Sequence, residues 1–354
     1  MFDFCIIGGG IAGLSAAAAL SELGRVVLLE AEDAIGYHSS GRSAALYEPN
    51  YGAPPNRALA AASGDALRAA GVLSPRGLLM VATAEDMPAF EVDSPHLGMD
   101  RIGAEAARGM VPILSPDIVD AAFTATAWDI DTDRLMQAHA RAIRAAGGET
   151  RTGARVTAIA RTAQGWRVTA RDDVEARVLV NAAGAWADGI AALSGVRPIG
   201  IVPHRRSMAR IPAPGGHDVA RWPMLFGPGE TWYAKPDAGA LIVSPAEEEA
   251  TEPHDAWADD MVLAEGIARY EAHVSEPVTR LIGNWAGLRS FAPDRVLVLG
   301  RDPGDPAFLW CAGQGGYGFQ TSAAAARHVA DVAGGRAPAI GADVAAALDP
   351  ARFR

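Results

Sequence analysis

The first stretch of the chain constrains the fold more than any other. Phe4–Ile7 is a short apolar run of the kind found in buried parallel strands. The pattern Gly8-x-Gly10-x-x-Gly13 follows it without an intervening loop and opens an Ala-rich helix. The first glycine permits a sharp turn, the second lets a pyrophosphate approach the backbone, and the third lets the helix lie close to the strand. The free amide groups of the helix N-terminus then form an anion site that needs no cationic side chain.

A second strand completes this unit. Arg25–Leu29 is predicted to be a strand, and it ends at Glu30. A carboxylate about 20 residues after the glycines can accept hydrogen bonds from both hydroxyls of an adenosine ribose. A glycine triplet alone would also fit a helix that only packs tightly, but strand, glycines, helix, strand and acid in this order predict dinucleotide binding. FAD and NAD share the adenosine end, so both remain open on this evidence.

Size, charge and cysteine content exclude several classes of protein. The 354 residues suffice for about two domains. A net charge of −11 argues against nucleic acids and anionic membrane surfaces as partners, because both require a basic face. Cys5 and Cys311 lie in apolar runs and are expected to be buried free thiols. No apolar run approaches the length of a transmembrane segment and no signal peptide is visible, so we expect a cytoplasmic protein.

The pattern typical of a dinucleotide-binding domain returns twice later in the chain. A small-residue turn, Asn181–Trp186, follows an apolar strand, and a Gly-rich loop, 313–318, precedes a helix expected over Thr321–Ala333. Between these parts the residues alternate with period two, which predicts a sheet with one solvated face. The expected fold is therefore α/β, with a Rossmann-like domain and a second domain built on a mixed or antiparallel sheet with helices. The first comprises 1–45, 129–195 and 285–354, and the second comprises 46–128 and 196–284.

Several local elements are predicted within this division. We expect a helix over Arg57–Ala70, because the prolines before it cannot continue a helix, and a second helix over Trp257–Val274. Thr124–Trp128 and Arg155–Ile159 are predicted to be strands.

With these motifs together, the chain resembles the FAD-dependent amino-acid oxidase family that includes D-amino-acid oxidase, glycine oxidase and sarcosine oxidase. The resemblance spans nearly the whole chain. It rests on the Gly8–Gly13 motif with Glu30, and on Gly41–Ala45, Val180–Trp186, Gly287–Asp294 and Gly313–Gln320. Within the family the chain is most similar to the bacterial D-arginine dehydrogenases, which share Trp232–Gly239 in kind.

The resemblance implies FAD as the cofactor, held without a covalent bond. Relatives that attach FAD covalently use a cysteine near Leu288–Ser290 or a histidine near Ala45, and this chain has neither. The positions that match the cofactor-binding residues of the family are Gly8, Gly10, Ile11, Ala12, Gly13, Glu30, Ala31, Ser39, Ser40, Gly41, Arg42, Ser43, Ala44, Ala45, Val156, Ala183, Gly184, Trp186, Gly315, Gly316, Tyr317, Gly318, Phe319 and Gln320. Arg42 is expected to pair with a phosphate, although a solvated loop arginine is the alternative.

The resemblance also implies a substrate site. Arg289 would form a two-point ion pair with a substrate carboxylate, which a lysine could not reproduce, and Tyr233 would donate a second hydrogen bond. Tyr51 would lie over the substrate and Arg206 would support the site. The alternatives are an internal salt bridge for Arg289, a core position for Tyr233 and simple packing of Tyr51 on Pro55. The remaining expected substrate contacts are Leu46, Glu48, Gly316 and Gln320.

The implied activity is oxidative deamination of a free D-amino acid by hydride transfer from Cα to the flavin, giving an imino acid that water converts to a 2-oxo acid and ammonia. The electrons would pass to oxygen or a quinone, and the protein would be a monomer or a small homo-oligomer. The D-arginine relatives place a carboxylate near Gly77–Leu79 and a histidine at the position of Leu46, whereas this chain has leucines there. Apolar side chains are therefore favoured, with Glu48 as the one acid that could meet a cation.

Two alternatives remain at this stage. The same arginine, tyrosine and flavin would serve for oxidation of a secondary amino acid such as sarcosine, proline or a cyclic imino acid. The other alternative is a dinucleotide-binding protein without catalysis.

Overall fold

The computed structural model describes residues 1–354 and contains two large sheets and one small one. The first sheet runs in the order β10-β11-β12-β1-β2-β9, with β20 paired to β12 and β19 paired to β20. β1 lies parallel to both β2 and β12, as the Rossmann-like arrangement requires. Its strands are β1 (Phe2–Ile7), β2 (Val26–Leu29), β9 (Glu149–Arg151), β10 (Ala158–Thr162), β11 (Gly165–Thr169), β12 (Val174–Asn181), β19 (Val298–Arg301) and β20 (Phe308–Ala312).

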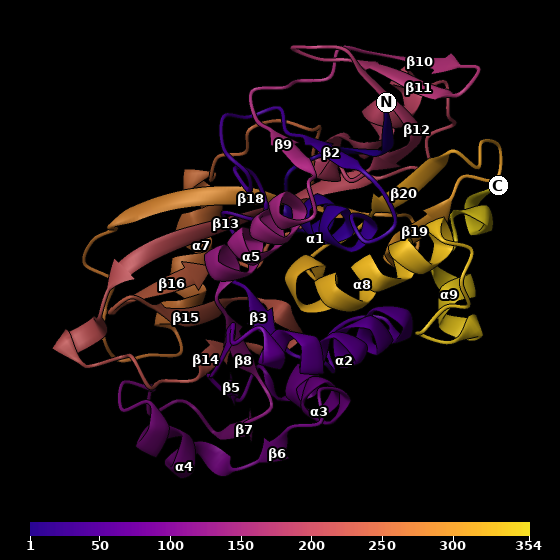
Figure 1. Cartoon of the computed structure of the whole chain (residues 1–354). Coiled ribbons are helices and arrows are strands. Elements are labelled where there is room, and N and C mark those ends of the chain that lie inside the picture. Colours follow the sequence, from indigo (N-terminus) through magenta and orange to yellow (C-terminus); the bar gives the residue numbers. More distant parts are fainter.

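Helices cover both faces of this sheet. On one face α1 (Ile11–Leu20) packs between α5 (Thr132–Ala145) and α8 (Gly318–Ala333), and α2 (Pro54–Ala69) packs on α8 (Figure 1). Their apolar side chains form one buried core with β1 and β2. The other face is covered by α6 (Ala187–Leu193) and the segment that follows it. Figure 1 shows both chain termini at the end of the molecule that holds this sheet.

The second sheet is mixed. Its order is β17-β13-β16-β15-β14-β5-β7-β6, with β18 on the free side of β13, and β14–β5 is its one parallel pair. A second core lies between this sheet and α7. The elements of this part are β5 (Leu78–Ala82), α3 (Met87–His96), β6 (Asp100–Arg101), α4 (Gly103–Met110), β7 (Asp120–Thr124), β13 (Val202–Pro212), β14 (Met224–Phe226), β15 (Tyr233–Asp237), β16 (Ala240–Ser244), β17 (Glu249–Ala250), α7 (Asp260–Glu271) and β18 (Gly283–Phe291).

A three-stranded sheet of β3 (Leu46–Tyr47), β8 (Trp128–Ile130) and β4 (Leu73–Pro75) joins segments that lie far apart in the sequence. The chain ends with α9 (Ala342–Leu348) and a short 3-10 turn. No helix combines the length and the apolarity that crossing a bilayer would require.

The predicted α/β class and the two kinds of sheet are confirmed. The division into domains remains our proposal, and the second sheet continues to Phe291, so the boundary expected at residue 285 falls inside β18. The prediction of a helix start at Arg57 was wrong, because Pro54 and Pro55 occupy the first helical positions, where a missing N–H costs nothing.

Two predicted strands were also wrong in part. β7 ends at Thr124 and β8 begins at Trp128, because the Ala127 carbonyl between them accepts hydrogen bonds from the backbone of residues 76 and 77. β10 begins at Ala158 rather than at residue 155, since the segment before it follows the wall of a cavity. Helix α7 is shorter at both ends than the helix expected over 257–274.

Candidate active site

A cavity of about 680 Å³ runs from the carboxyl ends of β1 and β2 to the second sheet. One end is lined by the Gly8–Ala12 turn and Glu30, and the other by residues of β13, β15 and β18. The carboxyl ends of parallel strands are the usual ligand-binding edge of a doubly wound sheet. The cavity therefore joins the predicted dinucleotide site to the predicted substrate site.

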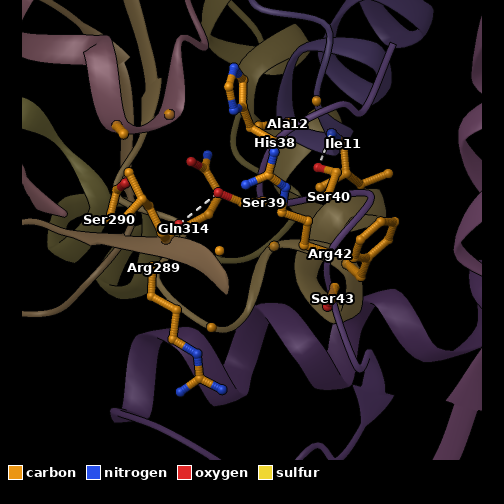
Figure 2. Close-up of a pocket in the computed structure, with 18 of the residues that line it drawn as sticks. Ile11, Ala12, His38, Ser39, Ser40, Arg42, Ser43, Arg289, Ser290 and Gln314 are labelled. Carbon is orange, nitrogen blue, oxygen red and sulfur yellow. Dashed lines mark hydrogen bonds between the residues drawn. The ribbon is translucent and has the colours of Figure 1, made fainter. Parts of the chain in front are cut away.

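The dinucleotide end is shaped by close backbone packing. Gly8 has a φ of +110°, and any Cβ there would collide with the Ala182 carbonyl. A Cβ at Gly13 would collide with the Gly8 carbonyl oxygen, so α1 can approach β1 only because this residue is glycine. The Ile11 amide at the start of α1 donates to the Ser40 hydroxyl at 3.0 Å, which fixes the adjoining loop (Figure 2).

Glu30 is buried at the end of β2 and lines the cavity. Its carboxylate accepts from the Gly9 amide at 2.6 Å and from the Glu32 amide at 2.9 Å. A carboxylate has about four acceptor positions, so two remain for the hydroxyls of a ribose. The glycine turn, the open helix N-terminus and this acid together fit the adenosine and pyrophosphate parts of FAD.

Arg42 makes contacts that differ from the expected phosphate pairing. Its guanidinium forms an ion pair with Asp255 and donates to the carbonyls of Ala256 and Ala286 at 2.8 and 3.0 Å. These protein partners occupy three of its five N–H donors. Arg42 therefore ties the loop after β2 to β18 and to the segment before α7.

Lys235 fixes the same loop from the opposite side. Its buried ammonium donates to the Ala44 and Ala45 carbonyls at 2.7 and 3.0 Å and pairs with Asp129 at 3.0 Å. Tyr233 lies two residues earlier on β15, so both side chains point to the same face of the sheet. One strand thus presents Tyr233 to the cavity and holds the loop beside it.

The N-terminus of α8 forms another wall of the cavity. Gly315 has a φ of +50°, and a Cβ there would collide with the Phe291 ring. Gly316, Gly318 and Gln320 line the cavity, and no side chain caps the first turn of α8. The free amides and the helix dipole favour negative charge at this point.

Most of the predicted cofactor contacts reach the cavity wall, and three lie behind it. Gly13 packs against Gly8, and the Gly41 amide donates to the Gly36 carbonyl. Tyr317 packs edge-on to Phe291, with ring centroids 6.4 Å apart. These three residues shape the wall without lining it.

The other end of the cavity holds two arginines, of which Arg206 is buried and Arg289 is partly exposed. β13 and β18 are antiparallel, with Arg206 opposite Gly287. Arg289 is two residues from Gly287, so it lies diagonally across from Arg206 on the same face of the sheet. Figure 2 shows the Arg289 side chain extending away from the loop that carries Ser39 and Ser40.

These two guanidiniums lack a full set of partners. Arg289 Nη1 and Arg206 Nε are buried without a hydrogen bond. Glu248 lies 3.3 Å from Arg206 and 3.8 Å from Arg289, and it also pairs with Arg295 at 2.7 Å. Burial, and then the positive charge of Arg289, lowers the pKa of Arg206. Two cations that share one partly exposed carboxylate, and that each keep a buried donor without a partner, form a strong site for an additional anion.

Two tyrosines flank this anion site. Tyr233 is buried on β15 and lines the cavity. Tyr51 lies on the loop between β3 and α2, where its hydroxyl donates to Glu230 at 3.0 Å and its ring lies 5.3 Å from that of Tyr317. Desolvation raises the pKa of Tyr51, so this hydroxyl stays protonated. Tyr51 therefore contacts cavity residues, which differs from simple packing on Pro55.

Sequence reasoning missed part of the cavity wall. Met224 and Phe226 alternate on β14, opposite Leu78 and Met80 of β5, and both line the cavity. The only signal was a three-residue apolar run, too short to assign to a face. Leu46 packs with this apolar wall, while the Glu48 amide donates to the Gln320 side chain at 2.9 Å.

Comparison with known proteins agrees with this geometry. Residues 3–332 match the model of a family described as FAD dependent oxidoreductase. The chain is 28% identical over 200 residues to the hydrogen cyanide synthase subunit HcnC of Pseudomonas aeruginosa, a match that covers 54% of this chain and 45% of that relative.

Solved structures share the fold over nearly the whole length. Glycine oxidase from Geobacillus kaustophilus superposes with a TM-score of 0.82 at 21% identity, over 100% of this chain and 99% of that one. L-Proline dehydrogenase from P. horikoshii gives 0.83 at 21% identity, over 99% and 97%. With the family match over most of its length and a cavity that fits the cofactor, this chain belongs to the FAD dependent oxidoreductase family and uses FAD.

Proposed function

We propose that the protein catalyses the FAD-dependent oxidative deamination of a free D-amino acid. The observation that carries this proposal is the pair of guanidiniums of Arg206 and Arg289, whose buried, unpartnered donors lie beside Tyr233 at one end of the cavity. A carboxylate is the ligand that matches planar guanidinium donors best. The known amino-acid activity named for glycine oxidase, a structural neighbour, supports the same substrate class.

The residues of the chain would act mainly by positioning and charge. FAD, when bound, supplies the two-electron acceptor. Arg289 and Arg206 hold the substrate carboxylate and Tyr233 donates a further hydrogen bond, which fixes the Cα–H bond in one orientation. The substrate ammonium must lose its proton before the C–H bond breaks, because the nitrogen lone pair provides the electrons for the C=N bond. The N-terminus of α8 stabilises negative charge that develops at its end of the cavity.

The products follow from this balance. The amino acid loses a hydride from Cα and becomes an imino acid. Water then adds to the C=N bond and releases ammonia, leaving a 2-oxo acid. Oxygen or a quinone would remove the two electrons from the cofactor.

The apolar wall supports a substrate with an apolar side chain. Leu46, Leu78, Met224 and Phe226 line the cavity near Tyr233. A guanidinium placed against leucines would lose its hydration without gaining partners. We therefore expect D-leucine, D-phenylalanine and D-methionine to be better substrates than D-arginine.

Oxidation of a secondary amino acid is the second candidate. The structural similarity to L-proline dehydrogenase favours it, and the same carboxylate site would serve. The two candidates differ only in the space around the substrate nitrogen, so they are distinguished by experiment.

The test is an anaerobic absorbance titration of the purified holoenzyme with D-amino acids, their L-enantiomers, sarcosine and proline. We expect the flavin bands to bleach with apolar D-amino acids. Tyr270→Phe is a matched control, because the Tyr270 hydroxyl is buried without a partner and Tyr270 does not line the cavity. Bleaching only by sarcosine or proline would establish the second candidate, and no bleaching by any amino acid would overturn both.

Non-covalent attachment of FAD has a separate test. Neither cysteine reaches the cavity, and burial raises the pKa of each thiol to about 12, which leaves both unreactive. Precipitation with acid should release the yellow colour into the supernatant. Colour retained in the pellet would contradict this expectation.

A further inference from the structure

One carboxyl group in the cavity wall has no role in the steps above. Glu48 is only 4% exposed, yet it lines the cavity. Its Oε1 accepts from the Asn50 amide at 2.9 Å, while Oε2 is buried with no hydrogen-bond partner. A buried carboxyl oxygen without a partner is unfavourable, so an unused acceptor at a cavity wall points to a ligand that supplies a donor.

Glu48 directly follows the short strand β3, which borders the apolar wall. Side chains alternate along β3, so Leu46 and Tyr47 point to opposite sides. Tyr47 packs in the core around α2 and α8, whereas Leu46 packs with Leu78 and Phe226. Glu48 lines the same cavity as Leu46, Leu78 and Phe226, so its carboxyl group and the apolar wall border one space.

The neighbouring groups hold Glu48 in place. Its backbone amide donates to the Gln320 side chain in the first turn of α8 at 2.9 Å. Gln320 is itself buried and lines the cavity. Glu48 is thus held through its backbone amide and through Oε1, and only Oε2 remains available.

No cation in the protein pairs with this carboxyl group. Arg57 is the one positive charge that acts on it, from a distance at which no ion pair forms. Burial raises the pKa of Glu48, which opposes the ionised form. A neutral hydroxyl group can both donate and accept, so it satisfies Oε2 whichever protonation state Glu48 has.

We propose that Glu48 recognises the tip of the substrate side chain and selects amino acids with an apolar stem that ends in a single hydrogen-bond donor, such as a phenol or an aliphatic hydroxyl. This inference rests on the proposed amino-acid oxidation. One free oxygen matches one donor. A guanidinium brings five donors, most of which would remain unpaired among leucines.

Matched substrate pairs test this selection. The kcat/KM values for D-tyrosine and D-phenylalanine, and for 6-hydroxy-D-norleucine and D-norleucine, are measured with the wild-type enzyme and with Glu48→Leu and Glu48→Gln. A site built to bind a hydroxyl group rejects the analogue that lacks it, so we expect the hydroxyl member to be preferred by about tenfold or more. Glu48→Leu should bring both ratios close to one, and Glu48→Gln, which retains an acceptor, should keep most of the preference.

A binding measurement keeps the test independent of turnover and of folding defects. 4-Hydroxyphenylpyruvate and phenylpyruvate are titrated against the oxidised holoenzyme, and the perturbation of the flavin spectrum gives a Kd for each. The hydroxyl compound should bind more tightly to the wild type, and this difference should be lost in Glu48→Leu.

The possible outcomes distinguish a failure of the proposed role of Glu48 from a failure of the proposed amino-acid oxidation. Turnover of apolar D-amino acids with ratios near one in the wild type would overturn the role of Glu48 and leave the proposed function intact. D-Lysine preferred over both members of the norleucine pair would show that Glu48 binds a cation, which also contradicts the inference. If no amino acid reduces the flavin, the proposed function fails first.

Discussion

The two ends of the cavity are lined by different kinds of chemical group. At the dinucleotide end the contacts come from backbone groups brought close by glycines, with Glu30 as the one buried acid. At the substrate end they come from long side chains on the second sheet, chiefly Arg206, Arg289 and Tyr233. A backbone site depends on a local sequence pattern, whereas a side-chain site depends on how distant strands pair. A substitution that disturbs the dinucleotide end is therefore expected to abolish cofactor binding completely. Substitutions at the substrate end are expected to lower the activity by different amounts.

The largest effect is expected for Gly13→Val. Its side chain would collide with the Gly8 carbonyl and push α1 away from β1. We expect loss of bound FAD together with a large loss of folded protein, measured by the ratio of flavin to protein absorbance and by circular dichroism. Gly109→Ala in α4 is the control, since a Cβ there meets no atom within 4 Å. Full flavin occupancy in Gly13→Val would show that cofactor binding at the dinucleotide end does not depend on this close backbone packing.

Arg289→Met should cause the next largest effect. Removing one partner of a hydrogen-bonded charge pair costs about 2–5 kcal/mol, so kcat/KM should fall by roughly 30-fold or more while FAD remains bound. Arg289→Lys should recover little, because an ammonium cannot make the two-point contact. A loss in kcat/KM of less than about threefold would show that Arg289 does not bind the substrate carboxylate and forms only an internal salt bridge.

Tyr233→Phe should have a smaller effect of the same kind. A hydrogen bond to a charged group contributes about 1.5–3 kcal/mol, which corresponds to roughly a 10- to 150-fold loss in kcat/KM. Tyr270→Phe, which removes a hydroxyl that has no partner, should leave kcat/KM nearly unchanged. Equal effects of the two changes would mean that Tyr233 acts only through packing.

The sequence alone predicts the local features of this molecule but not its long-range contacts. The Gly8–Gly13 unit and Glu30 were predictable because every residue involved lies within one local segment. The contact between Glu48 and Gln320 spans 272 residues, and no local periodicity encodes it. Arg42 was assigned to a phosphate because its loop is rich in small residues, but its partner Asp255 lies on a segment that only the tertiary fold brings near.

The rate of substrate oxidation should rise with pH. Only the deprotonated amine reacts, so below the pKa of the substrate ammonium kcat/KM should increase about tenfold per pH unit and then level off. The pKa of Tyr51 is raised by burial, so its hydroxyl does not lose its proton within this range. The measurement is a pH profile of flavin reduction with two substrates whose amine pKa values differ. A limb that falls with pH, or a pKa that does not move with the substrate, would assign the proton to the protein.

The smallest effect is expected for Arg155→Ala near the dinucleotide end. Arg155 is exposed and pairs with Glu32 at 3.1 Å, and exposed pairs contribute about 0–1 kcal/mol. We expect the Kd for FAD to change by no more than about fivefold, as measured by fluorescence titration of the apoprotein. A larger change would show that side-chain charge contributes strongly to this end as well.

Lys235 has a consequence for how the molecule can move. Its single ammonium joins the Ala44–Ala45 loop, Asp129 and the strand that carries Tyr233, so sliding of one part past another would break all three bonds together. The loop that carries Tyr51 has no such connection to Lys235. The spacing between the cofactor loop and Tyr233 therefore depends on a single side chain, because Lys235 lies on the strand of Tyr233 and binds the loop directly.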